Sequence, residues 1–197
     1  MMVLIMILSF AACGEKDTPG MAQSSSGEES NNEETSETEF ITMAFGSITM
    51  SVPNVFSAVT EQNGMYVSAG PEASIVVTAA TGVGMQPSGW NEDLVAEVLD
   101  VLYSSAYTDM ELAAFEGDVN MNGNKAVYYA FYGKGEDGKK RLVHVVTLYN
   151  ADVTAQYGIA LTHNAEDELF TSEVNSKIIN SITLAGNESY PVTGSEG

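Results

Sequence analysis

The composition of the chain changes abruptly at Phe40. Residues 15–39 contain eight acidic side chains, one lysine (Lys16) and no aromatic residue, whereas apolar and aromatic side chains recur from Phe40 to about Leu184. A segment with so little to bury cannot offset its ordering entropy, so we expect residues 15–39 to be disordered. The apolar part can close a hydrophobic core, and 197 residues suit one domain of ordinary size.

Short runs of β-prone residues, separated by turn signals, fill most of the apolar part. The dipeptide Gly70-Pro71 and the polar loop 134–139 are typical of such turns. The predicted strands are Phe40–Phe45, Ser47–Val52, Met65–Ala69, Ala73–Ala80, Leu112–Val119, Ala126–Gly133, Arg141–Tyr149 and Val153–Thr162. Because short links join the last three, we expect these to form an antiparallel meander.

Two further segments have the apolar spacing of helices that lie on a sheet. The first follows Asn91, a favourable N-cap, and carries Glu92 and Asp93 at the positive end of the helix dipole. The second is predicted to begin near Asn164 and to end around Ile182. This order predicts an α+β fold, with an antiparallel sheet of about six to eight strands flanked by two main helices.

The N-terminus, Met1–Ala12, is an apolar run that stops at Cys13, the single cysteine of the chain. A helix of this length reaches roughly 18 Å, short of the approximately 30 Å hydrocarbon core, so the run fits a secretory signal peptide rather than a membrane span. The segment Leu8–Cys13 resembles the lipobox of bacterial lipoproteins. Phe10 stands where that family usually has Leu, and no Lys or Arg precedes the apolar run, which favours a start upstream of Met1.

The lipobox resemblance implies that Cys13 is diacylated and becomes the N-terminus of the mature chain. We then expect residues 1–12 to be a signal peptide, 13–39 the lipidated cysteine with a disordered acidic tether, 40–185 the α+β domain, and 186–197 a flexible tail. The alternative is a buried N-terminal strand with a free cysteine in the core. The acidic segment disfavours that alternative, because it would separate such a strand from the core.

The formal net charge of -20 excludes whole classes of partner. A surface this acidic repels nucleic acid, and it also disfavours adsorption to anionic lipid headgroups. One cysteine cannot form an internal disulfide or a Cys-based zinc cluster.

A family resemblance covers roughly residues 43–184. The segment Phe45–Pro53 is similar to the opening of the Mog1/PsbP-like fold, as are the long meander and the closing helix with Ile179–Ile182. The resemblance implies a sandwich of this type, known among small extracytoplasmic lipoproteins, and it supplies no catalytic residues. Members that bind partner proteins make a protein partner the expectation here.

The sequence contains no motif that specifies a reaction, a metal or a cofactor. A nucleophile elbow, a zinc-protease helix, a phosphate-binding P-loop and an EF-hand loop are all missing from it. The glycine pair in Gly82–Pro87 precedes a helix, but Pro87 stands where a dinucleotide loop needs its third glycine, which favours a plain surface loop. We therefore predict no catalytic residue, no metal ligand and no cofactor.

The two histidines leave an alternative open. Two cannot form a three-histidine zinc site, although a mixed site of His163 with Glu166 or Asp167 is arithmetically allowed. We expect His144 to be a packed or edge residue of a strand, and His163 to lie at the start of a helix.

A group of tyrosines in the predicted meander is the candidate recognition surface. Its members are Tyr128, Tyr129, Tyr132, Tyr149 and Tyr157. Most aromatic side chains in sheets serve packing, which is the first interpretation, but an open tyrosine face would suit binding of a protein partner. We expect the basic cluster 139–141 to contact the acidic surface of the protein itself.

These features favour a lipid-anchored, extracytoplasmic binding or assembly module without catalytic activity, at the outer face of a bacterial membrane. One alternative is a solute-capturing lipoprotein that serves a transporter. The other is an enzyme whose site combines scattered carboxylates with His144 or His163.

Overall fold

The structure is a computed structural model, and it describes residues 38–78 and 81–185. The predicted signal peptide, Cys13, nearly all of the predicted tether and the C-terminal tail lie outside these residues.

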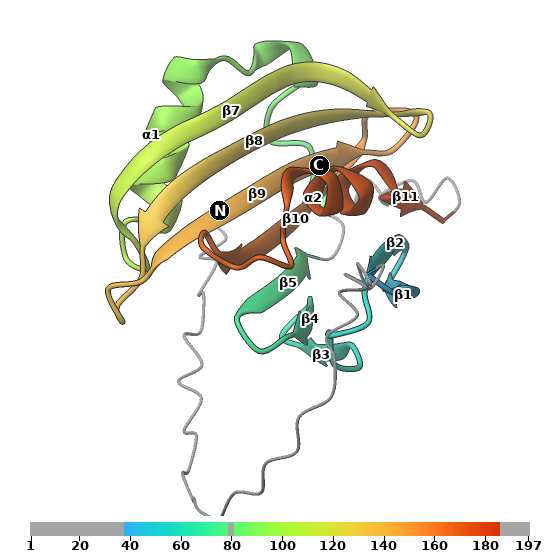
Figure 1. Cartoon of the computed structure of the whole chain (residues 1–197). Coiled ribbons are helices and arrows are strands. Elements are labelled where there is room, and N and C mark those ends of the chain that lie inside the picture. Colours follow the sequence, from blue (N-terminus) through green and yellow to red (C-terminus); the bar gives the residue numbers. More distant parts are fainter. Residues whose placement is uncertain (1–37, 79–80, 186–197) are drawn as a thin grey trace, which may run out of the picture. The chain divides into compact units, whose positions relative to one another are not determined.

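An antiparallel sheet of eight strands forms the centre of the fold (Figure 1). Its order is β3-β4-β5-β10-β9-β8-β7, and β6 pairs with β10 beside this path. Its strands are β3 (Thr60–Gln62), β4 (Met65–Ala69), β5 (Ala73–Thr78), β6 (Thr81–Gly82), β7 (Thr108–Met121), β8 (Asn124–Lys134), β9 (Lys140–Tyr149) and β10 (Ala155–Asn164). The predicted meander is confirmed, because β8, β9 and β10 pair in sequence order.

A second, smaller sheet has the order β1-β2-β11. It contains β1 (Phe40–Phe45), β2 (Ile48–Pro53) and the short β11 (Thr183–Leu184), which closes it from the far end of the chain. The sequence predicted β1 and β2 but assigned them to one common sheet. They are separate because β2 pairs with β1 on one edge and β11 on the other, so neither of its edges reaches the large sheet.

The first helix, α1 (Glu92–Tyr103), follows a 3-10 turn, η1 (Pro87–Gly89). Its predicted cap is confirmed: the Asn91 side chain accepts a hydrogen bond from the backbone N–H of Leu94 at 2.9 Å. This bond satisfies one of the N–H groups that every helix start leaves unpaired.

The second helix, α2 (Ser172–Asn180), begins later than predicted. Asn164 ends β10, and its side chain and that of Asp167 accept backbone hydrogen bonds from Glu166 and Leu169, at 3.1 and 3.0 Å. These local bonds compete with a helix and hold the segment in turns. The cap is Thr171, whose hydroxyl accepts from the Val174 N–H.

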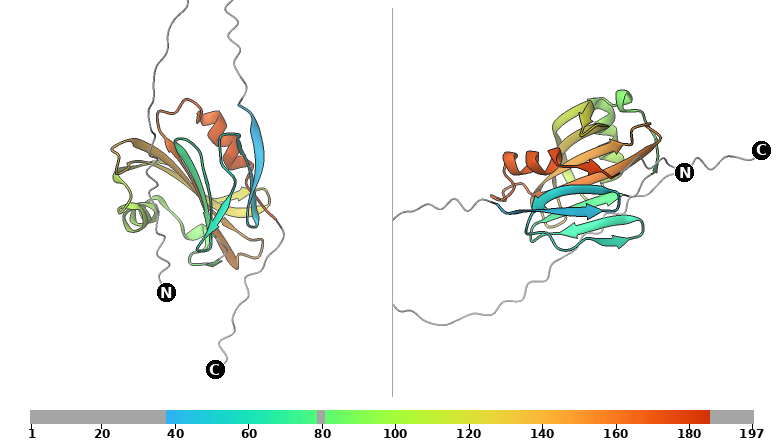
Figure 2. Two further views of the ribbon diagram at one scale, coloured as in Figure 1. Left: turned by 90° about the horizontal axis from the view of Figure 1, so that it is seen from below. Right: turned by 90° about the vertical axis from the view of Figure 1, so that its right-hand side faces the viewer.

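Each face of the large sheet has its own core. The further views place α1 on one side of the sheet and α2, with β1, on the other (Figure 2). The α1 core contains Val95, Leu99, Tyr103, Val127, Tyr129, Phe131, Val143, Val145 and Tyr149. The α2 core contains the buried side chains of the small sheet and α2, and those of the opposite face of the large sheet, among them Ile75, Val146, Leu148, Ile159 and Leu161.

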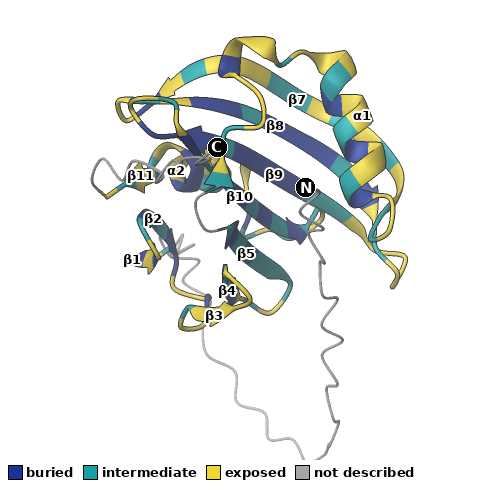
Figure 3. Cartoon of the chain, turned by 180° about the vertical axis from the view of Figure 1, so that it is seen from behind, coloured by how far each residue is buried: buried dark blue, intermediate teal, exposed yellow. Residues whose placement is uncertain are grey.

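Burial follows from this layering (Figure 3). Residues of β9 alternate between the two cores, so the strand is apolar on both faces. The outer side of α1 stays exposed, and Val101 on it keeps 62% of its surface in contact with solvent.

We expect Leu148→Ala to destabilise the protein strongly and Val101→Ala to leave its stability almost unchanged. Leu148 is 0% exposed in β9, so its truncation leaves a cavity and costs about 2–5 kcal/mol in the free energy of unfolding. Val101 loses little, within about 0.5 kcal/mol. Urea denaturation of the two variants checks this, and equal losses would contradict the described core.

Candidate functional site

Side chains of β8 point alternately to the two faces of the sheet. Tyr128 and Tyr132 therefore lie on the face opposite α1, whereas Tyr129 and Phe131 belong to the α1 core. Tyr128 and Tyr132 are half-buried, and β7, the edge strand beside them, places Glu116 opposite Tyr128. The five candidate tyrosines thus do not form one surface.

We call the part of the sheet formed by Glu111, Glu116, Tyr128, Tyr132 and Lys140 the tyrosine face. The β7–β8 register sets Glu111 opposite Tyr132 and Glu116 opposite Tyr128, so each tyrosine has a carboxylate beside it. Both glutamates and Lys140 are exposed. Aromatic rings bordered by charge form the kind of surface that recognises polar or cationic groups.

The other three candidate tyrosines are buried. Tyr149 is 0% exposed; its hydroxyl accepts a hydrogen bond from Trp90 Nε1 at 3.1 Å and donates one to the Met85 carbonyl at 2.9 Å. Tyr129 stacks on the Trp90 indole, with ring centroids 6.1 Å apart. Tyr157 lies in the α2 core. These residues stabilise the sheet from within, and only Tyr128 and Tyr132 keep access to solvent.

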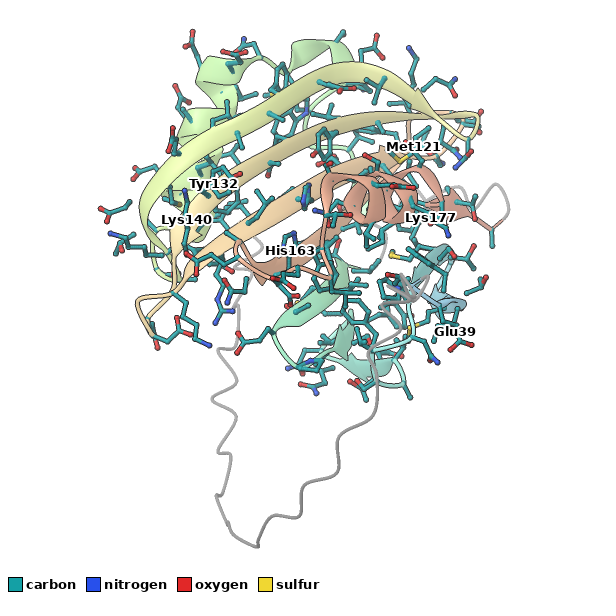
Figure 4. The ribbon with its side chains drawn as sticks, in the orientation of Figure 1. Glu39, Met121, Tyr132, Lys140, His163 and Lys177 are labelled. Carbon is teal, nitrogen blue, oxygen red and sulfur yellow. The ribbon has the colours of Figure 1, made fainter. Side chains whose placement is uncertain are left out.

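Residues 139–141 contact acidic side chains as predicted, with one difference. Lys139 pairs with Glu72 at 2.7 Å, and Arg141 pairs with Glu72 at 3.0 Å and with Asp137 at 2.6 Å. Lys140 instead lies over the ring of Tyr132, with Nζ 4.0 Å from the ring centroid (Figure 4). The sequence alone did not predict this contact, although the β8–β9 hairpin register makes the two residues diagonal neighbours.

Both histidines lie on the side of the sheet that carries Tyr128 and Tyr132. They are farther than these tyrosines from β7, the edge strand. His144 is 7% exposed in β9, so it is a packed residue. His163 is 2% exposed in β10, and its predicted place at a helix start is wrong, because β10 continues through Asn164. Their rings stack at 5.6 Å, between Tyr128 at 6.1 Å and Phe170 at 4.6 Å.

Hydrogen bonds show which ring nitrogen of His163 carries the proton. They also identify one partner of His144. The Asn164 carbonyl only accepts, so His163 Nδ1, 2.8 Å away, must donate, and the neutral ring leaves Nε2 without a proton. His144 Nδ1 lies 2.9 Å from the Tyr128 hydroxyl. Among the described residues, neither histidine has a hydrogen-bond partner at Nε2.

Burial keeps both rings neutral. Burial, and after it the neighbouring His163, lowers the pKa of His144 to about 4. Burial also lowers the pKa of His163, against the hydrogen bond to Asn164 and the charge of Asp167, which both raise it. The pKa of Tyr128 is raised, first by burial and then by the negative charge of Glu116. At neutral pH the group is an uncharged aromatic stack with a phenol at its outer end.

The described residues show no arrangement for a metal ion: residues 38–78 and 81–185 contain no group of three or more His, Cys, Asp or Glu side chains placed to hold one. Residues 83–86, between β6 and η1, form a loop in which the Gly84 N–H donates to the Gln156 side chain at 3.3 Å. Within the same ranges, no helix has the length and apolar character needed to cross a membrane.

Comparison with solved structures identifies the fold. The Ran-binding protein Mog1p of Saccharomyces cerevisiae is similar at a TM-score of 0.50 and 11% sequence identity, over 75% of this chain and 96% of that one. A mutant of the protein Mog1 has a TM-score of 0.45 and 13% identity, over 73% and 86%, and a protein from Bacteroides thetaiotaomicron VPI-5482 has 0.41 and 11%, over 74% and 48%. No protein-family model matches the sequence, and no curated protein matches it. The predicted Mog1/PsbP-like α+β fold is confirmed.

The histidine stack predicts that the protein loses stability in mild acid. An unfolded histidine has a pKa of 6.5, against about 4 for His144 in the fold, so folding favours the neutral ring. The contribution of the neutral His144 ring to the free energy of unfolding is fully present above pH 6.5. It is lost as the pH falls towards 4, by roughly 3 kcal/mol at about 1.4 kcal/mol per pH unit.

Urea denaturation between pH 7.5 and 5 measures the first part of this loss, about 2 kcal/mol by pH 5. The window lies above pH 4.5, the ordinary pKa of Glu72, whose lowered value makes that carboxylate matter only in stronger acid. In the His144→Gln variant the free energy of unfolding should fall less steeply with falling pH than in the parent protein, whatever the stability of the variant at pH 7.5. Identical slopes in the two proteins would contradict the assignment.

Proposed function

We propose that this chain is a lipid-anchored, extracytoplasmic binding or assembly module without catalytic activity, held at the outer face of a bacterial membrane through Cys13. The lipobox-like segment Leu8–Cys13 and the acidic residues 15–39 support the anchor and the tether. A flexible coil of about 25 residues reaches roughly 28 Å, enough to hold a folded domain clear of lipid headgroups.

The observation that carries the binding function is the tyrosine face. Tyr128 and Tyr132 are half-buried on the sheet face that α1 does not cover, and β7 places one exposed glutamate opposite each of them. Tyrosine offers contact area and a hydroxyl at low entropic cost, which is why it is frequent in protein interfaces. We infer that the partner is a protein that docks on this face.

The charge distribution supports a protein partner over nucleic acid. The cationic side chains that the structure describes already contact other residues of the same chain. For instance, Lys125 pairs with Asp118 at 2.6 Å, and Lys134 pairs with Asp109 at 2.7 Å. Nothing in this pattern offers a phosphate backbone the basic surface that it requires.

The fold is compatible with such a role. Mog1p is a Ran-binding protein, so a protein of this fold can present a surface to a protein partner. The similarity extends to the fold alone, and the partner of the present chain follows from its own surface.

A change of Cys13→Ser should leave the signal segment uncleaved by lipoprotein processing and the chain without its lipid. The thioether-linked lipid has no other attachment point, because the chain has one cysteine. Mass spectrometry of the N-terminal peptide and membrane fractionation check this, with Ser24→Ala as the control. An unmodified Cys13 in the membrane fraction of the parent protein, or a variant with the same mature size as the parent protein, would disprove the anchor.

A photo-crosslinking residue tests the binding face in intact cells. With p-benzoylphenylalanine in place of Tyr132, we expect a discrete adduct with another protein. The same residue in place of Val101, on the exposed side of α1, is the matched control and should give no such adduct. Adducts of equal yield at both positions, or none at position 132, would refute this face as the docking site.

A further inference from the structure

Lys140 differs from the cations around it in the kind of contact that it makes. Lys139, Arg141 and Lys134 each pair with a carboxylate, at distances between 2.6 and 3.0 Å. Lys140 has no carboxylate within 4.0 Å among the described residues and places its ammonium group on the ring of Tyr132. The ring face of Tyr132 is therefore a cation site, filled by a residue of the same hairpin.

The contact contributes little to the fold. Lys177, the other described lysine that lies on a ring, joins α2 to β1, because its Nζ lies 3.7 Å from the centroid of the Phe40 ring. Lys140 and Tyr132 are already neighbours in the β8–β9 ladder, so their contact bridges no separate elements. A different cation can replace Lys140 at small cost.

Two carboxylates lie on β7, the strand that borders Tyr132 on the side away from β9. Glu111 lies opposite Tyr132, and Glu116 lies opposite Tyr128, whose pKa its charge helps to raise. Both are exposed and belong to β7, whose outer edge is unpaired in the described sheet. The face thus combines an aromatic cation site with two negative charges spaced along an edge strand.

We propose that the tyrosine face binds a basic segment of a partner protein, and that an arginine or lysine of that segment takes the place of Lys140 on the ring of Tyr132, with Glu111 and Glu116 as its counter-charges. The inference rests on the proposed binding function and names the chemical class of the partner.

Charge excludes the other occupants that this chain could supply. A second copy carries the same net charge of -20, and residues 15–39 hold eight acidic side chains against one lysine, so both are repelled by Glu111 and Glu116. A basic segment is attracted, and its encounter with an acidic surface is accelerated.

The test uses the full-length chain and tri-arginine amide as the probe, with the neutral tri-citrulline amide as the matched peptide. Titration followed by NMR of backbone amides and tyrosine rings gives both the position and the Kd. We expect the largest shifts at Tyr132, Tyr128 and Glu111 with tri-arginine, and none with tri-citrulline. Binding should weaken as salt is raised, because the charges are exposed.

Three variants make the result specific. Lys140→Gln removes the internal competitor and should tighten binding by about 2- to 5-fold, which damage to the fold could not do. Tyr132→Leu should weaken it by about 2- to 5-fold. Glu111→Gln with Glu116→Gln should weaken it more than Glu97→Gln with Asp100→Asn on α1, a double change of equal net charge.

The outcomes separate cleanly. If tri-arginine shifts mainly the α1 carboxylates, if both double variants weaken it equally, or if Lys140→Gln fails to tighten it, the cation site is disproved. A protein adduct at position 132 in cells, together with such a result, would retain the binding function and overturn only the basic partner. Without any adduct, the proposed function itself would fail.

Discussion

Burial of both faces of the large sheet is the constraint on which the rest of the structure depends. In β9, Val143 and Val145 face α1, while Val146 and Leu148 face α2 and the small sheet. Neither face of a strand in this position is exposed to solvent, so its polar side chains must pack in the interior. His144 is such a residue, and it fits because Tyr128 and His163 flank it and because its ring stays neutral. The histidine stack is therefore a consequence of the layering, not a separate feature.

The same layering decides where the surface can be functional. α1 covers one face, through Val95, Leu99 and Tyr103. On the other face, α2 and the small sheet pack against β5, β9 and β10, and cover β7 and the outer half of β8 less completely. The exposed remainder is the tyrosine face. Tyr129 and Tyr149, although close in sequence or space, fall on the covered side, because a strand alternates with a period of two.

Sequence patterns predicted the local elements better than their assembly. Phe40–Phe45 and Met65–Ala69 have the predicted limits, because alternating side chains and turn residues act locally. The split into two sheets depends on pairing between Thr49 and Thr183, far apart in sequence, which no local pattern encodes. The start of α2 was misjudged because Asn164 and Thr171 are both good caps, and only the hydrogen bonds of the intervening turns select the second. The wrong prediction that His163 lies at a helix start has the same cause, because it assumed that the helix begins near Asn164.

The cation site shows how a candidate site can be partly predicted. The sequence predicted packing as the first role of these tyrosines and recognition as the second, but their division between the two faces, and the contact of Lys140, required the register. That register sets Lys140 against Lys134, and Lys134 is neutralised by Asp109 at 2.7 Å. The other lysine at the hairpin end, Lys140, lies on the ring of Tyr132, with Nζ 4.0 Å from the ring centroid. A strand pair that places two cations opposite each other and supplies one carboxylate leaves its second cation on a weak contact. Within residues 38–78 and 81–185, Glu111 and Glu116 form no ion pair, and both belong to the same face as this contact. An incoming basic side chain can displace a weak contact of this kind.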